Sequence, residues 1–600
     1  MRLSIASAMV GGVLLSACGD GGTSTAARKA NEVPERGGTL RLIGTTDIDH
    51  LSTTSGNTMQ AAFLFRAFTR QLFAYPTAPS YEEQTEVVPD LATTLPTREN
   101  GGISSDYTTY TVHIRQGARW NSSPPRQVTA TDQVRGFKLL CNPVLPSGGL
   151  VYYLPTIAGL KTFCGAFAKV PPTAAAIRTF VDTHEIDGVR ALDDSTVQFH
   201  LTQPASDFLH ILARHFGSPV PVEYLAYVPD DAESRRHTLS DGPYRITSYL
   251  PNRELTLGRN PAWDPASDPI RKAWVDSIRV DETSNGTSAQ QQLESGVADL
   301  PWDAPPPAVD VTRLLASGDP RLLLAPGGDH VINMKYLVVN ALSPSQQHAL
   351  ARKDVRQALQ YAVDRAAIAQ ALGGSAVARP HTQVVLPFAS GYRAGFDPYP
   401  SAGAHGDSAK AQQMLSAAGF PRGVVLKLAL ANGPASVPIA TTLQQSFRRV
   451  GVTVTLMPFS PADFWGKLLG NPDAVRRGDW DLALTEIFPD WQGNNGRTTL
   501  ALLFDGRTFG PNTQNFGGYD NPDVNNLIDR ALAARTRAEA DSLWALTAAR
   551  VADDAPILPL VVAKAAVYVG PRVRGCLVSA AINCDLTNVW LAGTSTGGRP

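Results

Sequence analysis

Polar and hydrophobic residues alternate along several short segments in the first half of the chain. Residues 107–120 and 195–204 carry an apolar side chain at nearly every second position, which is typical of strands with one buried face. Residues 242–263 repeat this pattern on both sides of Pro251 and Asn252, a pair that favours a tight turn. The first half is therefore predicted to be rich in β-structure and to contain a hairpin at this turn.

The second half begins with apolar residues at helical spacing. Residues 353–374 place their apolar side chains on one helical face, which predicts one continuous helix that ends at Gly373. Residues 407–419 predict a second helix, with Asp407 as its N-cap and Gly419 at its C-terminal end.

Strand-like and helix-like spacing then alternate. Strand patterns cover residues 424–430, 452–457 and 482–487, and helix patterns cover residues 441–450 and 462–469. This order predicts parallel strands joined by right-handed crossovers. A further helix is expected to begin at Asn521, because proline follows it as the first helical residue. The predicted fold class is α/β.

Asp490 lies just beyond the third predicted strand of this run. Open α/β sheets bind ligands at the carboxyl ends of their strands, so this position predicts a binding carboxylate. The alternative is that Pro489 and Asp490 form an ordinary turn, because both residue types are common in turns. Position alone leaves both interpretations open.

Composition bounds the class of protein. A chain of 600 residues is too long for one hydrophobic core and predicts two or three domains. A hydrophobic fraction of 43% and a charged fraction of 18% are ordinary for a folded chain. The net charge is −1 and no basic stripe occurs, so no nucleic-acid partner is expected.

The N-terminus is typical of an exported protein. Residues 1–17 combine one arginine with a short apolar segment, which predicts a signal peptide rather than a membrane-spanning helix. The segment LSAC, which ends at Cys18, resembles the lipobox of bacterial lipoproteins, in which this cysteine is acylated. Residues 18–36 then read as a flexible tether. We therefore expect attachment to the outer face of a bacterial membrane through a lipid on Cys18.

Four further cysteines remain: Cys141, Cys164, Cys576 and Cys584. An even number in an exported chain indicates disulfides, and four cysteines allow three pairings. We favour Cys141–Cys164 and Cys576–Cys584, because local pairing closes short loops. A metal site is not expected, since the spacings are not CxxC and no histidine cluster accompanies them.

Few segments of the sequence resemble catalytic or metal-binding motifs. GTSTG at residues 593–597 matches GxSxG, but the strand and helix that flank a nucleophile elbow are missing around it. DIDH at residues 47–50 lacks the glycine and glutamate of a calcium loop. We therefore predict no catalytic residue, no metal and no cofactor, and a secreted hydrolase is the least favoured alternative.

Several segments together resemble one family, the extracytoplasmic solute-binding proteins of peptide-type ABC importers (solute-binding family 5). The resemblance extends from Gly37 to about Gly575 and depends on the order and spacing of the segments. They are GGTLRL, PDLATTLP, YTVHIRQGARWNSSPPRQVTATDQVRGFKLL, DDSTVQFHLTQPASDFL, DGPYRITSYLPNRELTLGRNPAW, QQLESGVADL, KDVRQALQYAVDRAAIAQAL, AKAQQMLSAAGF and GGYDNPDVNNLIDRAL.

The resemblance implies a two-lobed fold of the periplasmic-binding-protein type (type II, cluster C) with an extra small domain on the first lobe. Lobe I would comprise residues 37–74, 222–329 and 556–600. Domain II would comprise residues 75–221, and lobe II residues 330–555. The ligand would lie between the lobes, which close on it by hinge motion.

The resemblance also implies the site. An aspartate before an aromatic residue, after a strand of lobe II, binds the N-terminal amine of a peptide in this family. The implied ligand-binding residues are Asp490, Trp491, Phe488, Ile487, Ser55, Gly56 and Asn57. Two departures are clear: QGNNGR follows the Asp–Trp pair where Asp-Pro is common, and Ser240–Asp241 replaces the usual small residues before GPY.

The implied function is the substrate-binding component of an ABC importer. It would bind short peptides and deliver them to permease subunits in the membrane, acting as a lipid-tethered monomer and not as an enzyme. The alternative within the same fold is a sugar, an opine, a metal chelate or a signalling peptide as ligand.

Overall fold

The computed structural model describes residues 32–303, 305–325, 333–433, 435–511, 513–564, 566–578 and 584–593. The predicted signal peptide, the lipidation site Cys18, most of the predicted tether and most of the GTSTG segment lie outside these residues.

The largest sheet has six strands in the order β15-β19-β14-β18-β16-β17. These are β14 (Asn333–Val339), β15 (Ala378–Pro380), β16 (Val425–Ala431), β17 (Thr453–Phe459), β18 (Leu482–Ile487) and β19 (Ile557–Ala563). Strand β16 pairs in parallel with both β17 and β18, so the predicted parallel run is confirmed. The sheet as a whole is mixed, because β14 runs antiparallel to β18 and to β19.

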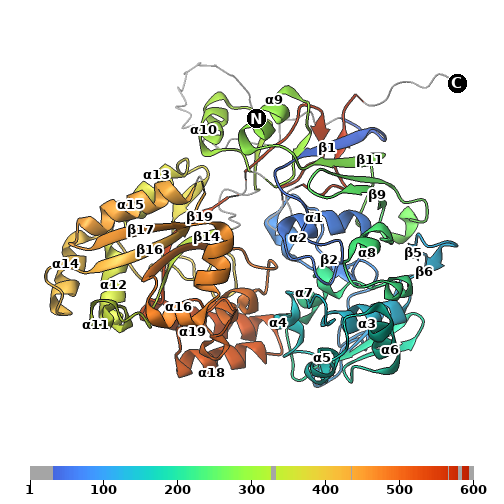
Figure 1. Cartoon of the computed structure of the whole chain (residues 1–600), viewed down its shortest axis with the longest axis horizontal. Coiled ribbons are helices and arrows are strands. Elements are labelled where there is room, and N and C mark those ends of the chain that lie inside the picture. Colours follow the sequence, from blue (N-terminus) through green and yellow to red (C-terminus); the bar gives the residue numbers. More distant parts are fainter. Residues whose placement is uncertain are drawn as a thin grey trace, which may run out of the picture. The chain divides into compact units, whose positions relative to one another are not determined.

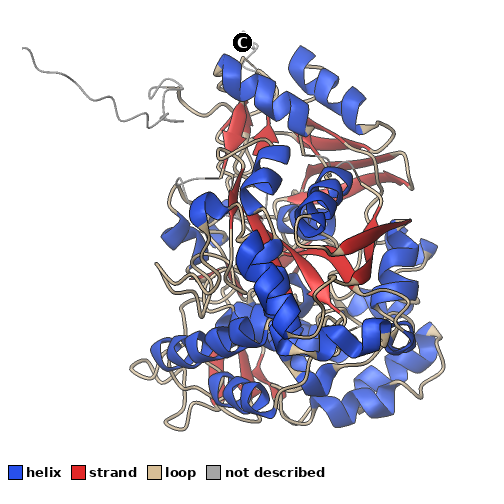
Figure 2. Cartoon of the chain, turned by 90° about the vertical axis from the view of Figure 1, so that its left-hand side faces the viewer, coloured by secondary structure: helices blue, strands red, loops and turns tan. Residues whose placement is uncertain are grey.

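Helices cover both faces of this sheet (Figures 1 and 2). Alternate residues of β14 enter different cores: Leu337 and Val339 pack in one cluster, and Met334 and Tyr336 pack in the other. The first cluster is closed by α12 (Lys353–Ala362), α13 (Arg365–Ala371), α14 (Ser408–Ala417) and α15 (Ser436–Arg448). The second is closed by a π-helix (Asp463–Leu469), α16 (Pro472–Arg477), α18 (Pro522–Leu532) and α19 (Arg537–Asp554).

The continuous helix predicted over residues 353–374 is wrong, because α12 ends at Ala362 and α13 begins at Arg365. Asp364 lies between them and accepts a hydrogen bond from the Ala367 amide at 2.9 Å, which makes it the N-cap of α13. The same carboxylate contacts Arg449 at 3.1 Å. The N-cap predicted at Asp407 is confirmed, since its side chain accepts from the Lys410 amide at 2.9 Å.

A second sheet has five strands in the order β12-β1-β11-β10-β9. They are β1 (Thr39–Ile43), β9 (Tyr244–Leu250), β10 (Glu254–Arg259), β11 (Ser277–Asp281) and β12 (Leu300–Pro301). The hairpin predicted around Pro251 and Asn252 is confirmed: β9 and β10 pair antiparallel, and Asn252 has a φ of 58°. Leu40, Leu42 and Phe65 belong to the core beneath this sheet.

A separate core lies around a three-stranded sheet, β4-β8-β7, made of β4 (Thr109–His113), β7 (Val189–Asp193) and β8 (Thr196–His200). We call this unit the small domain. Its core includes Phe137 of α3 (Ala130–Leu139) and Phe199 of β8. A disulfide between Cys141 and Cys164 joins the end of α3 to α5 (Leu160–Phe167), with Cα atoms 5.5 Å apart.

The chain leaves the six-stranded sheet after β19, and we call the part that carries the five-stranded sheet the first lobe. Strand β19 lies within the six-stranded sheet, so the chain leaves that sheet after Ala563 rather than at the predicted boundary of 555. Strand β20 (Ala566–Tyr568) then pairs with β13 (Leu322–Leu324). A second disulfide, Cys576–Cys584, follows, with Cα atoms 4.9 Å apart.

Buried charges join the small domain to the first lobe. Asp90, next to β3 (Val88–Pro89), accepts from Arg70 Nε at 2.8 Å and from Arg271 Nη2 at 2.9 Å. Arg271 also contacts Asp268 at 3.3 Å, and the side chains of these four residues are fully buried. Asp241 adds a third carboxylate, because its Oδ1 accepts from the Arg70 amide at 3.0 Å. The pKa of Asp241 is raised to about 7, chiefly by burial; the charge of Arg70 opposes the rise and that of Asp90 adds to it.

We predict that Asp241→Asn stabilises the protein at pH 8 and leaves it unchanged near pH 4. In the unfolded chain this carboxyl ionises near ~3.9, whereas the folded chain holds its proton to about pH 7. The native state therefore binds more protons between these values, and stability falls as pH rises through this window. The expected gain at pH 8 is on the order of a few kcal/mol. Melting temperatures at both pH values test this, with the exposed Asp182→Asn as control; equal shifts in both variants would contradict it.

Candidate functional site

Asp490 lies three residues beyond the end of β18, at the carboxyl edge of the parallel strands. Tyr152 of α4 (Leu150–Tyr153) donates its hydroxyl to Oδ2 of Asp490, and Nη1 of Arg214 donates to the Asp490 backbone carbonyl. Nη2 of Arg214 lies 3.7 Å from Oδ1. The Asp490 side chain is 37% exposed. The predicted binding carboxylate is thus accessible and is held by residues from the small domain.

Asp490 lines a cavity of about 80 Å³ between elements distant in sequence. Its polar lining includes Arg66, Tyr75, Arg214, His215 and Asp585. Two ion pairs balance the charges, Arg214 with Asp490 and Arg66 with Asp585, the latter at 2.7 Å. Burial and the neighbouring Arg214 lower the pKa of His215 to about 3, so its ring is neutral at physiological pH. The cavity is therefore polar and close to neutral overall.

Trp491 takes a different place from the one that the resemblance implies. Its side chain is only 1% exposed and lies in the hydrophobic core of the small domain. The ring packs edge-on against Tyr152 with centroids 5.0 Å apart, and Nε1 donates to the Asn494 carbonyl at 3.1 Å. In this conformation Trp491 joins two parts of the protein and does not line the cavity.

Ile487 and Phe488 also lie away from the cavity at Asp490. Ile487 is buried in the core of the six-stranded sheet. Phe488 is 39% exposed and lines a second hollow, of about 500 Å³, together with Ile487, Trp465 and Phe516. The rings of Trp465 and Phe516 lie 5.8 Å apart there. This aromatic hollow is distinct from the cavity at Asp490, and the two have no lining residue in common.

Ser55, Gly56 and Asn57 do not line the cavity. Ser55 is buried and its hydroxyl donates to the Leu145 carbonyl at 3.2 Å. The Gly56 carbonyl accepts from Nε2 of His215 at 2.7 Å, which connects this loop to the cavity wall. Asn57 is exposed, and its backbone N–H donates to Oδ2 of Asp49 at 2.7 Å. The structure thus brings Gly56 near the residues around Asp490 and engages Ser55 elsewhere.

The segment QGNNGR, which departs from the family pattern, contacts the small domain along its length. Tyr81 donates its hydroxyl to Gln492 at 3.0 Å, and Asn494 Nδ2 donates to Ser206 at 3.3 Å. Arg497 makes two hydrogen bonds to Asp207, of 2.6 and 2.9 Å, and both side chains are buried.

Both glycines of this segment are required by close approach. Gly493 has a φ of 68°, and a Cβ there would lie 3.0 Å from the Thr85 carbonyl oxygen. A Cβ on Gly496 would lie 2.3 Å from the Trp544 ring. The departure from the family pattern therefore has a structural reason.

Sequence reasoning missed Tyr152, Arg66, Arg214 and Asp585. Tyr152 and Arg214 precede Asp490 by 338 and 276 residues. Neither residue lies in a sequence motif that is typical of a binding site. The one available signal was the non-family QGNNGR, which marked the segment that docks on the small domain.

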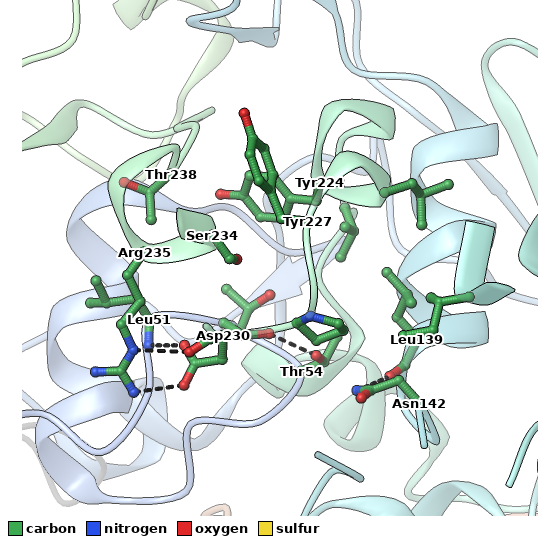
Figure 3. Close-up of a pocket in the computed structure, with 16 residues that line it drawn as sticks. Leu51, Thr54, Leu139, Asn142, Tyr224, Tyr227, Asp230, Ser234, Arg235 and Thr238 are labelled. Atoms are coloured by element: carbon green, nitrogen blue, oxygen red, sulfur yellow. Dashed lines mark hydrogen bonds and ion pairs between the residues drawn. The ribbon is translucent and has the colours of Figure 1, made fainter. Parts of the chain in front are cut away.

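A further pocket, between the first lobe and the small domain, is shown in Figure 3. Its volume is about 30 Å³, which leaves room for little more than water. Its charged residues already satisfy each other, because Asp230 accepts from Arg235 Nη2 at 2.7 Å and from the Leu51 amide at 3.0 Å (Figure 3). We do not assign a ligand to it.

The described residues contain no group of three or more His, Cys, Asp or Glu side chains arranged to hold a metal ion. In the DIDH segment, Asp47 accepts from Tyr249, Asp49 accepts from Asn57 and Thr58, and His50 contacts Asp230. These side chains are engaged with different partners. Over the part of the chain that the structure covers, every helix is too short or too polar to cross a membrane.

The sequence of this chain is similar to those of known proteins. Residues 86–506 match the sequence profile of the bacterial extracellular solute-binding proteins, family 5 (middle region). Heme-binding protein A of Haemophilus influenzae is 23% identical over 514 residues, 82% of each chain. The dipeptide-binding protein of Escherichia coli K12 is 26% identical over 432 residues, 69% of each chain.

Solved structures agree on the fold. The clavulanic acid biosynthesis oligopeptide binding protein 2 superposes with a TM-score of 0.82 at 27% identity, covering 93% of this chain and 96% of that one. A periplasmic binding protein DppA from Helicobacter pylori, in complex with the peptide STSA, superposes with a TM-score of 0.70 at 19% identity over 93% and 98% of the two chains.

The sheets, the small domain and these similarities define a two-lobed substrate-binding protein of the periplasmic type. The chain belongs to the bacterial extracellular solute-binding proteins, family 5. This is a family of extracytoplasmic substrate-binding proteins of transporters, not of enzymes.

The buried ion pair between Arg497 and Asp207 should be costly to break on one side only. Arg497→Gln leaves Asp207 buried without its cation and should destabilise the protein by on the order of 3 kcal/mol. The double variant Asp207→Asn, Arg497→Gln replaces the pair with neutral polar groups and should recover most of this loss. Thermal unfolding of the wild type and the two variants measures the effect. A double variant no more stable than Arg497→Gln would contradict the role given to the pair.

Proposed function

We propose that this protein is the extracytoplasmic substrate-binding component of an ABC importer, which binds short peptides between its two lobes and delivers them to a membrane permease. The observation that carries the proposal is Asp490, an accessible carboxylate at the carboxyl edge of β18, where this lobe meets the small domain.

The contacts of Asp490 suit a ligand amine. Oδ2 is engaged by the Tyr152 hydroxyl, whereas the described contact of Oδ1 is the long one of 3.7 Å to Arg214. A peptide ammonium beside Oδ1 would form a charge-assisted hydrogen bond, which is stronger than a neutral one. Exclusion of bulk water on lobe closure would strengthen this contact further.

The names of similar proteins support a peptide ligand. The dipeptide-binding protein of Escherichia coli and the oligopeptide binding protein 2 are both similar along most of this chain. The aromatic hollow formed by Trp465, Phe488 and Phe516 would take an apolar or aromatic group of the ligand. A sugar, an opine or a metal chelate is the alternative ligand. The similarity to Heme-binding protein A supports testing non-peptide ligands as well.

The domain division and the membrane attachment belong to the same proposal. Lobe I would comprise residues 37–74, 222–329 and the chain after Ala563; domain II would comprise residues 75–221, and lobe II residues 330–563. The separate cores of the sheets support this division, and Leu72, Phe73 and Leu225, just outside domain II, also pack in its core. We further propose that a lipid on Cys18 tethers the protein outside the cell membrane, and that it acts as a monomer without enzymatic activity.

Asp490→Asn should weaken the binding of free-amine peptides more than tenfold, a loss of about 1.4 kcal/mol or more. The substitution removes the charge and preserves the shape of the side chain. Calorimetry with alanine oligomers of two to five residues, with free and with acetylated N-termini, measures the effect. Asp473→Asn, an exposed aspartate on the same lobe, is the control. Equal affinities of wild type and Asp490→Asn would refute the amine anchor.

Native mass spectrometry of the purified protein tests the ligand class directly. We expect a mixture of short peptides to be retained by the wild type and depleted in Asp490→Asn. A single retained sugar, heme or metal chelate would overturn the proposed peptide specificity.

A further inference from the structure

We propose that Tyr152 and Arg214 of the small domain are positioning residues for Asp490, so that the amine site is complete only when lobe II is docked on the small domain. The inference rests on the proposed function and deepens it. The carboxylate carried by lobe II is oriented by groups of another domain, so docking and amine recognition occur together.

Tyr152 fixes one oxygen of the carboxylate. Its side chain is 3% exposed, and its hydroxyl donates to Oδ2 of Asp490. Burial, together with the charge of Asp490, raises the pKa of Tyr152 well above its usual range, so the hydroxyl stays protonated and remains a donor. The ring is held by its edge-on contact with Trp491, at 5.0 Å between centroids. Rotation of the carboxylate would break the bond to Oδ2.

Arg214 fixes the main chain at the same residue. Its Nη1 donates to the Asp490 carbonyl, and its guanidinium lies over the Phe216 ring, 5.4 Å from the centroid. The side-chain contact from Nη2 to Oδ1 is longer, at 3.7 Å. Arg214 therefore holds the backbone more closely than the carboxylate, and Oδ1 is the oxygen that remains for a ligand donor.

The orientation of the Asp490 carboxylate depends on docking, because the segment that follows Asp490 is itself docked on the small domain. Trp491 enters the core of the small domain, and Arg497 forms its buried pair with Asp207 six residues later. Separation of the two parts would expose the Trp491 ring, unpair two buried charges and remove both partners of Asp490. A two-lobed protein that closes by a hinge would thus assemble the oriented carboxylate only on closure.

The neighbouring tyrosine provides a matched control. Tyr153 is also buried, and its hydroxyl donates to the Ile211 carbonyl at 3.0 Å, within the small domain. Tyr153→Phe and Tyr152→Phe each remove one buried hydroxyl and its hydrogen bond. Only Tyr152→Phe releases Asp490, so a difference between the two variants separates positioning from a general loss of stability.

The experiment compares the full chain with both variants by calorimetry, with free-amine and N-acetylated alanine oligomers of two to five residues. We expect the wild type and Tyr153→Phe to prefer the free-amine peptides at least tenfold. Tyr152→Phe should reduce that preference at least fivefold, while its affinity for the acetylated peptides stays within twofold of the wild type. Unchanged amine preference in Tyr152→Phe would overturn the inference and leave the peptide-binding proposal intact.

Arg214 is tested in the same assay with Arg214→Gln. A lower amine preference supports positioning, because the backbone of Asp490 is then no longer held. Tighter binding of free-amine peptides would instead show that Arg214 competes with the ligand for the carboxylate, and would overturn its role as a positioning residue. A wild type that binds neither set of peptides would refute the proposed function itself, a result distinct from any effect of the variants.

Discussion

The docking of residues 490–497 on the small domain is the contact on which the site depends. This segment belongs to the lobe built on the six-stranded sheet, yet Trp491 is buried in another core and Arg497 is paired with Asp207. Burying an indole favours docking through its large apolar surface. The buried ion pair gives little net stability but penalises any arrangement that leaves one charge alone. Together these contacts favour one docked geometry over near alternatives.

A second set of buried charges acts on the other side of the small domain. Arg70, Arg271, Asp90 and Asp268 join it to the first lobe with side chains fully withdrawn from water. Hydrogen bonds satisfy these groups in specific directions, so the small domain cannot rotate on the first lobe without unpairing charges. The small domain is thereby a fixed platform, and motion is expected where lobe II meets it. Asp241, whose pKa is raised by burial, adds a third carboxyl group to this platform.

Much of the fold could be predicted from local patterns, and the site only in part. Period-two segments and glycine or proline boundaries located β16, β17, β18 and the hairpin at Asn252, because these elements depend on burial of one face and on turn chemistry. The break at Asp364 escaped prediction, because a capping carboxylate overrode a helical apolar stripe. Asp490 could be placed by strand order, whereas Tyr152 and Arg214 could not, since long-range packing alone brings them together.

Trp491 packs in the core of the small domain and also supports Tyr152, which contacts Asp490. An aromatic residue after the aspartate would be expected to face a ligand, but here its ring packs on Tyr152, and Tyr152 in turn holds Asp490. The aromatic residue therefore acts on the carboxylate indirectly, by supporting the residue that orients it. Under the proposed function, amine recognition would therefore respond to changes within the small domain, at α4 or beside Phe216, that leave the lobe carrying the carboxylate unaltered. The small domain would then be part of the binding site.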